Sequence, residues 1–104
     1  MEDSFRAFVL EQLEPLSKTG ELKTRAMFGA HGLYLNGKFF GIIHSGRLYL
    51  KTDEKSRKKY LDAGMKPFKP NKKQTLKNYY EVPADLLEDS EELPKWAGDS
   101  LGFE

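Results

Sequence analysis

Residues 24–52 read TRAMFGAHGLYLNGKFFGIIHSGRLYLKT, and closely spaced turn signals divide this stretch into short segments. Asn36-Gly37 is the strongest two-residue hairpin signal, because both central residues of a type I′ turn need a positive φ. Ser45-Gly46 and Gly29–Gly32 mark two further turns. We therefore predict an antiparallel meander. Its strands are expected at Thr24–Phe28, Gly32–Leu35, Lys38–His44 and Arg47–Thr52.

The two tight turns set which side chains share a face of this sheet. With two-residue loops, Leu35 lies opposite Lys38, and His44 lies opposite Arg47. One face then carries no charge, and we expect it to be the core face, covered by an amphipathic helix over residues 4–16. The residues on this predicted core face are Tyr34, Phe39, Gly41, Ile43, Leu48 and Leu50.

The opposite face is both apolar and cationic, which is unusual for the solvated side of an antiparallel sheet. Its residues are Leu33, Leu35, Phe40, Ile42 and Tyr49, with Lys38, His44, Arg47 and Lys51 among them. An apolar centre with a charged rim is typical of a protein interface. We predict a partner-binding site made of Lys38, Phe40, Ile42, Arg47, Tyr49 and Lys51. Two alternatives stay open: the C-terminal segment with Trp96 and Leu101 covers this face, or a second copy of the chain does so in a homodimer.

Outside the meander, Asp53 is a good N-cap for a helix over residues 54–63 that ends at Gly64. Residues 65–78, with two prolines and five lysines, are expected to form a mobile or extended loop. Tyr79–Val82 is predicted to form one more strand, followed by two helical pieces within 84–101. The 104 residues fit one domain, and we predict an α+β fold, in two layers, with an antiparallel sheet and flanking helices.

The charge is unevenly distributed, although the net charge is only +1. Residues 51–77 carry ten Lys or Arg against three Asp or Glu, whereas residues 78–104 carry one against eight. The two segments could neutralise each other or be solvated faces. Alternatively, a basic strip meets a polyanion, which would give weak, salt-sensitive nucleic-acid binding without sequence specificity. For that alternative the candidate nucleic-acid-binding residues are Lys58, Lys59, Lys69, Lys72, Lys73 and Lys77.

No pattern of catalytic or cofactor-binding residues stands out. The chain has no cysteine, and its two histidines, His31 and His44, lie on separate segments of the predicted sheet. The glycines near His31 match no phosphate-binding loop. We expect a protein that is not an enzyme and that binds no metal and no cofactor. Without a signal peptide or an apolar run of membrane-spanning length, a cytoplasmic location is expected, with no membrane contact.

Three blocks of sequence support a family resemblance. Residues 25–34 (RAMFGAHGLY), 48–53 (LYLKTD) and 79–83 (YYEVP) resemble, in order and spacing, the N-terminal domain of the TfoX/Sxy competence regulators. This resemblance implies a secretion-chaperone-like fold with the order helix, three or four strands, helix, strands, helix. It also implies a bacterial protein that regulates transcription of DNA-uptake genes with a protein partner such as the cyclic-AMP receptor protein.

The sequence departs from the family pattern in two respects. Gly29-Ala30 stands where the family has two glycines, and the full-length regulators continue into a helical C-terminal domain. We therefore expect a stand-alone N-terminal domain that binds a macromolecule and does not catalyse a reaction.

Overall fold

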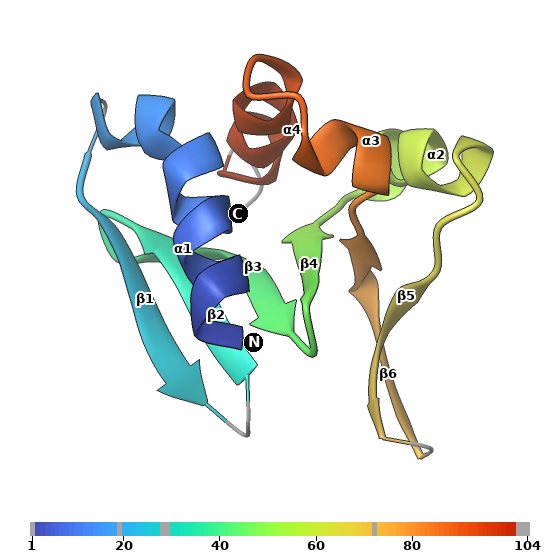
Figure 1. Ribbon diagram of the computed structural model, residues 1–104. Helices are drawn as coiled ribbons and strands as arrows, with labels where there is room; N and C mark the ends of the chain where they lie inside the picture. The colour runs from blue at the N-terminus through green and yellow to red at the C-terminus, as the bar shows by residue number, and fades with distance from the viewer. Residues whose placement is uncertain (1, 19, 28–29, 72, 102–104) are drawn as a thin grey trace.

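The computed structural model describes residues 2–18, 20–27, 30–71 and 73–101. In this part of the chain, six strands form one antiparallel sheet in the order β1-β2-β3-β4-β6-β5 (Figure 1). The strands are β1 (Leu22–Met27), β2 (Ala30–Leu35), β3 (Lys38–His44), β4 (Arg47–Lys51), β5 (Pro67–Asn71) and β6 (Gln74–Glu81). The helices are α1 (Glu2–Gln12), the 3-10 helix η1 (Glu14–Lys18), α2 (Glu54–Asp62), α3 (Ala84–Leu87) and α4 (Glu92–Leu101).

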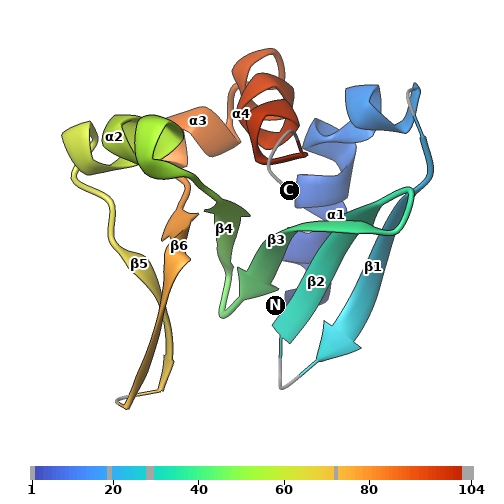
Figure 2. The same cartoon turned by 180° about the vertical axis from the view of Figure 1, so that it is seen from behind.

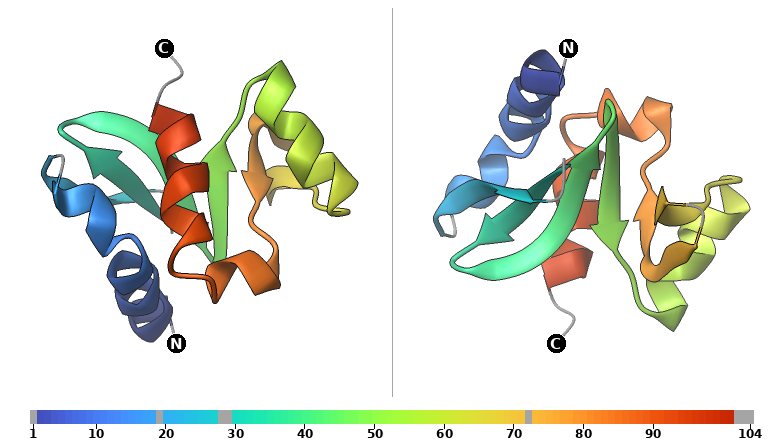
Figure 3. Two further views of the ribbon diagram at one scale, coloured as in Figure 1. Left: turned by 90° about the horizontal axis from the view of Figure 1, so that it is seen from above. Right: turned by 90° about the horizontal axis from the view of Figure 1, so that it is seen from below.

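The helices form one layer over one face of the sheet. Seen from the opposite side in Figure 2, α2, α3 and α4 lie above the strands, and α1 lies behind β2 and β3. Figure 3 shows from above that α4 lies between α1 and the α2–α3 pair. The predicted two-layer α+β arrangement is confirmed.

The local signals around the meander are confirmed in detail. Asn36 and Gly37 have φ of 53° and 82°, and Ser45 and Gly46 have φ of 49° and 72°. These positive values belong to type I′ turns, and they place Leu35 opposite Lys38 and His44 opposite Arg47 as predicted. The capping box of α2 is also present, since the Asp53 carboxylate accepts from the Ser56 amide at 2.8 Å.

The predicted faces of the sheet are wrong over half of the meander, because β3 contains a β-bulge. Tyr34 pairs with Phe39, but the next residue of β2, Leu33, pairs with Gly41, so Phe40 is an extra residue. An extra residue reverses the facing of every side chain on one side of it. Beyond the bulge, Leu33, Leu35 and Phe40 therefore turn toward the helices, while Tyr34 and Phe39 turn away.

The core beneath the helices follows from this facing. It joins the strands to α1, α2 and α4, and its fully buried members include Val9, Leu13, Leu33, Phe40 and Leu93. Phe40 has 0% of its surface exposed. The helix predicted over residues 4–16 splits into α1 and η1, since Pro15 cannot continue the α-helical hydrogen bonding.

The predicted loop 65–78 is the second error. Residues 67–81 instead form a hairpin arm of β5 and β6, in which Phe68 lies opposite Leu76. Phe68 is 5% exposed, and its ring lies 4.5 Å from that of Tyr49, so one aromatic contact fixes the arm against the sheet. Pro67 and Pro70 are tolerated because β5 is an edge strand, where a missing backbone N–H costs no inner hydrogen bond.

Candidate binding surfaces

The predicted sheet-face site does not form an exposed surface. Phe40 belongs to the core under the helices, on the other side of the sheet from Ile42 and Tyr49. Ile42 and Tyr49 are only 4% and 8% exposed, because Phe68 of the hairpin arm packs on them. The alternative cover, the C-terminal segment, is also wrong, since α4 packs on the opposite face of β3 and β4. The prediction of an apolar interface centre on this face is therefore corrected.

The charged members of that predicted site do not all lie on one face of the sheet. The Lys38 ammonium donates to the Leu101 carbonyl at 3.2 Å, on the helix side. Arg47 forms an ion pair with Glu81 at 2.7 Å, and this hydrogen bond raises the pKa of the arginine. Lys51 pairs with Tyr79 across β4 and β6. The six predicted residues therefore divide between the two faces of the sheet, with Lys38 and Phe40 on the helix side and the other four on the opposite side.

A row of aromatic side chains, which the sequence-based prediction missed, lies on the sheet face turned away from the helices. The rings of Tyr34 and Phe39 are 5.2 Å apart, and those of Phe39 and Tyr79 are 5.6 Å apart. All three side chains are partly exposed. Burial raises the pKa of the Tyr79 hydroxyl, and Tyr34 nearby raises it further. We call these three residues the aromatic row.

Five of the six lysines of the predicted strip are described and exposed, but they do not form one strip. Lys58 and Lys59 lie on α2, within the helical layer. The others lie along the hairpin arm, at Lys69, Lys73 and Lys77. Lys72 lies outside the described residues. The arm is thus the main basic projection of the described chain, separate from the helical layer.

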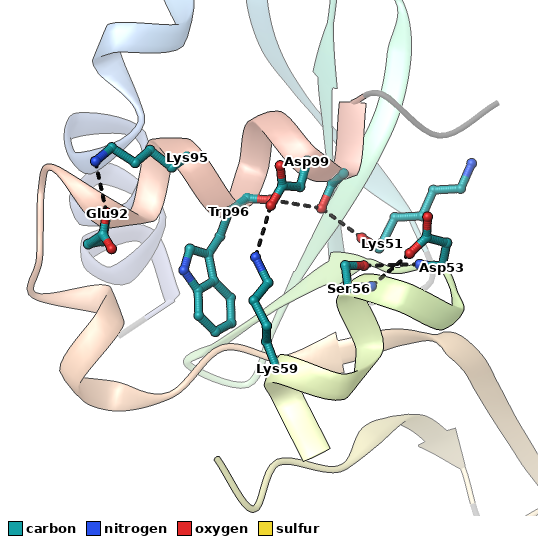
Figure 4. Close-up of polar contacts among 9 residues, drawn as sticks. Lys51, Asp53, Ser56, Lys59, Glu92, Lys95, Trp96 and Asp99 are labelled. Atoms are coloured by element: carbon teal, nitrogen blue, oxygen red, sulfur yellow. Dashed lines mark hydrogen bonds and ion pairs between the residues drawn. The ribbon is translucent and has the colours of Figure 1, made fainter. Parts of the chain in front are cut away.

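An ion pair between Lys59 and Asp99 joins the basic and acidic segments of the chain. Figure 4 shows Lys59 rising from α2 toward α4, where its ammonium lies 2.9 Å from an Asp99 carboxylate oxygen. The same ammonium lies 4.6 Å from the centre of the Trp96 ring. Since both partners of this pair are about half exposed, its contribution to stability is small, about 0–1 kcal/mol. Mutual neutralisation of the two segments is therefore local.

A shallow groove lies beside this contact, between α2, α3 and α4. Trp96 is one of its lining residues and is partly exposed, with its ring packed edge-on against that of Tyr60 at a centroid distance of 4.8 Å. Tyr60 beneath it is 2% exposed, and burial raises the pKa of its hydroxyl far above the usual value. The groove is lined by Lys59, Asp62, Ala63, Pro83, Asp85, Leu86, Asp89 and Trp96. We call it the Trp96 groove.

The Trp96 groove combines an apolar floor with an acidic rim. Asp62, Asp85 and Asp89 are exposed, while Leu86 is buried. The one cation in the lining, Lys59, is held by Asp99. Asp89 also accepts from the Glu91 and Glu92 amides before α4, which fixes the position of its carboxylate. The groove therefore presents excess negative charge around an aromatic centre.

The two histidines occupy unrelated positions. His31 lies in β2 opposite Ile43, and His44 packs edge-on against Phe68 at 5.4 Å. Within residues 2–18, 20–27, 30–71 and 73–101, no group of three or more His, Asp or Glu side chains is arranged to hold a metal ion. Among the helices of these same ranges, none is long and apolar enough to span a membrane.

Comparison with known proteins agrees with the resemblance seen in the sequence. The profile of the TfoX N-terminal domain matches residues 11–103, nearly the whole chain. The DNA transformation protein TfoX1 of Aliivibrio fischeri is 32% identical over 81 residues, covering 69% of this chain and 39% of the relative. The chain thus spans about two fifths of the length of this curated relative. The chain belongs to the TfoX N-terminal domain family.

Proposed function

We propose that this chain is a non-enzymatic regulatory module in DNA-uptake competence, and that it acts by binding a transcription regulator through the Trp96 groove. The cyclic-AMP receptor protein is the candidate partner. Family membership supports the process, and the groove supports protein contact as the mode of action.

The observation that carries the proposal is the position of Trp96. Tryptophan is enriched among the residues that dominate protein–protein binding energy, which usually lie centrally with energetically neutral contacts around them. Here the indole is supported from beneath by Tyr60, so its orientation is set before a partner arrives. Pre-positioning lowers the entropic cost of association. The shallow shape suits a protein surface better than an enclosed small molecule.

The acidic rim selects the chemistry of the partner surface. Exposed carboxylates at Asp62 and Asp85 favour a partner that brings Lys or Arg side chains to the rim and an apolar group to Trp96. The stems of Lys and Arg are themselves apolar and pack well beside an indole. A basic, partly apolar surface of a regulator meets both requirements.

A pair of charge reversals tests this proposal. Asp85 lies in the groove lining, whereas Glu88, three residues later, is equally exposed but outside the lining. Asp85→Lys should weaken binding of purified cyclic-AMP receptor protein about three- to tenfold, mainly through a slower association rate. Glu88→Lys changes the net charge by the same amount and should have little effect. Equal effects of the two variants, or no binding by the unmodified chain, would refute the proposal.

A further inference from the structure

The aromatic row lies among positive charges. Tyr34 pairs with Lys23 of β1, and Tyr79 pairs with Lys51 of β4. Because directly paired residues of an antiparallel sheet share a face, both lysines lie on the side of the rings. Arg25, two residues after Lys23 on the same strand, faces the same side and is exposed.

Negative charge on this face is largely compensated. Glu21 forms an exposed ion pair with Lys23 at 3.4 Å. Glu81 pairs with Tyr49 and therefore faces the same side, but its carboxylate is held by Arg47 at 2.7 Å. The hairpin arm turns toward this side as well, since its Phe68 covers Tyr49. The arm also carries the exposed lysines Lys69, Lys73 and Lys77. The electrostatic field on this side favours an anion.

We propose that this sheet face is a platform for single-stranded nucleic acid. Unpaired bases stack on the rings of Tyr34, Phe39 and Tyr79, and phosphates meet Lys23, Arg25 and Lys51. Aromatic rings on a sheet surface flanked by basic side chains are the arrangement that stacks successive bases without reading their sequence. The lysines of the arm add attraction but carry no stacking surface.

The geometry favours a single strand over a duplex. The three partly exposed rings form a contiguous row at separations of 5.2 Å and 5.6 Å, with neighbouring rings tilted by 43° and 44°. Paired bases within a duplex do not offer their faces to such a surface. This proposal concerns a different face from the Trp96 groove, so either can fail without the other.

The test is binding of fluorescein-labelled oligo(dT) of about 15 nucleotides, followed by anisotropy at about 50 mM salt. Phe39→Leu keeps an apolar side chain in the row but removes its π-face. It should weaken binding roughly five- to a hundredfold. The matched control is Phe8→Leu, which makes the same exchange at an aromatic residue that is 36% exposed on α1. This control should leave the affinity unchanged.

Three further variants keep the outcome decisive. If Phe39→Leu does not fold, Tyr34→Leu at the other end of the first ring pair replaces it, with the same expected loss. Lys51→Gln should weaken binding at low salt and reduce the dependence on salt by about one phosphate contact. Asp85→Lys, the groove variant, should bind oligo(dT) no more weakly than the unmodified chain.

The proposal is overturned by any of four results. These are no binding of oligo(dT) at low salt, equal affinity of Phe39→Leu and Phe8→Leu, and equal competition by duplex DNA of the same length. The fourth is equal competition by poly-glutamate, which would show that the face is a cationic surface that binds acidic protein as well as it binds nucleic acid.

Discussion

Replacing Phe40 by alanine separates the bulged sheet from the regular hairpin that the turns alone would give. In the structure Phe40 is fully buried under the helices, whereas its neighbour Phe39 is partly exposed on the opposite face. In a regular hairpin the two would exchange places. The bulge therefore predicts which of the two adjacent phenylalanines contributes more to the free energy of unfolding.

The magnitude follows from burial. Truncating a fully buried phenylalanine typically costs about 3–5 kcal/mol, from lost transfer energy and the cavity left behind. A domain of this size has a free energy of unfolding of about 5–15 kcal/mol. Phe40→Ala should therefore remove a large part of the stability and lower the Tm by roughly 15–30 °C. Phe39→Ala loses ring contacts with Tyr34 and Tyr79 and should cost only about 1–2 kcal/mol.

The measurement is urea unfolding of the three proteins, followed by circular dichroism and by the fluorescence of Trp96, the single tryptophan. Both probes should give the same midpoint for a two-state domain. If Phe39→Ala proves more destabilising than Phe40→Ala, the bulge is wrong. The aromatic row would then be part of the core.

The remaining predictions concern local contacts. Gly41→Ala should lower the free energy of unfolding by about 1–3 kcal/mol in urea, because the added Cβ would lie 3.0 Å from the Tyr49 carbonyl oxygen; an unchanged midpoint would contradict this. Hydrogen bonds from the first-turn amides of α2 hold the pKa of Asp53 below its ordinary value of 3.8. The ionised carboxylate therefore stabilises the fold above that pH, and this stabilisation is lost as the pH falls through the lowered pKa. Asp53→Asn should therefore differ from the unmodified chain less at pH 2 than at pH 5, and a constant difference in urea midpoint would exclude the effect. Ser100→Ala removes a buried 2.7 Å hydrogen bond to the Lys51 carbonyl and should cost about 1–2 kcal/mol in the same assay, whereas a neutral result would show that the carbonyl finds another donor.

The sequence predicts best what short-range geometry decides. Asn36-Gly37 and Ser45-Gly46 can form only a few turn types, so the β3 bounds and both hairpin pairings are confirmed without knowledge of the rest of the chain. The Asp53 cap of α2 is equally local. These features depend on residues within a few positions of one another.

The errors arise where both faces of a strand are apolar. From Phe39 to Ile43 every residue except glycine is large and hydrophobic, so the alternation does not reveal that Phe40 is an extra residue. The register then depends on packing against the helices, which is a long-range effect. The prediction of a loop over residues 65–78 was wrong for a related reason. The prolines and lysines of this segment indicate a loop, whereas the hairpin arm depends on the long-range contact of Phe68 with Tyr49.

The corrected facing of the strands assigns the proposed binding roles to partly exposed side chains instead of buried ones. Phe40, Ile42 and Tyr49 hold the fold together, and the proposed sites use partly exposed aromatic residues instead, namely Trp96 on the helical layer and the aromatic row on the sheet. The acidic rim of the Trp96 groove and the basic side chains beside the aromatic row suit partners of opposite charge.

The most direct test of the proposed protein contact uses the single indole N–H resonance of Trp96 in a ¹H–¹⁵N spectrum, recorded while cyclic-AMP receptor protein is added. Binding in the groove should shift or broaden this resonance together with the amides of Asp62 and Asp85. An unchanged indole resonance at saturating partner, or changes confined to β3 and β4, would contradict the account.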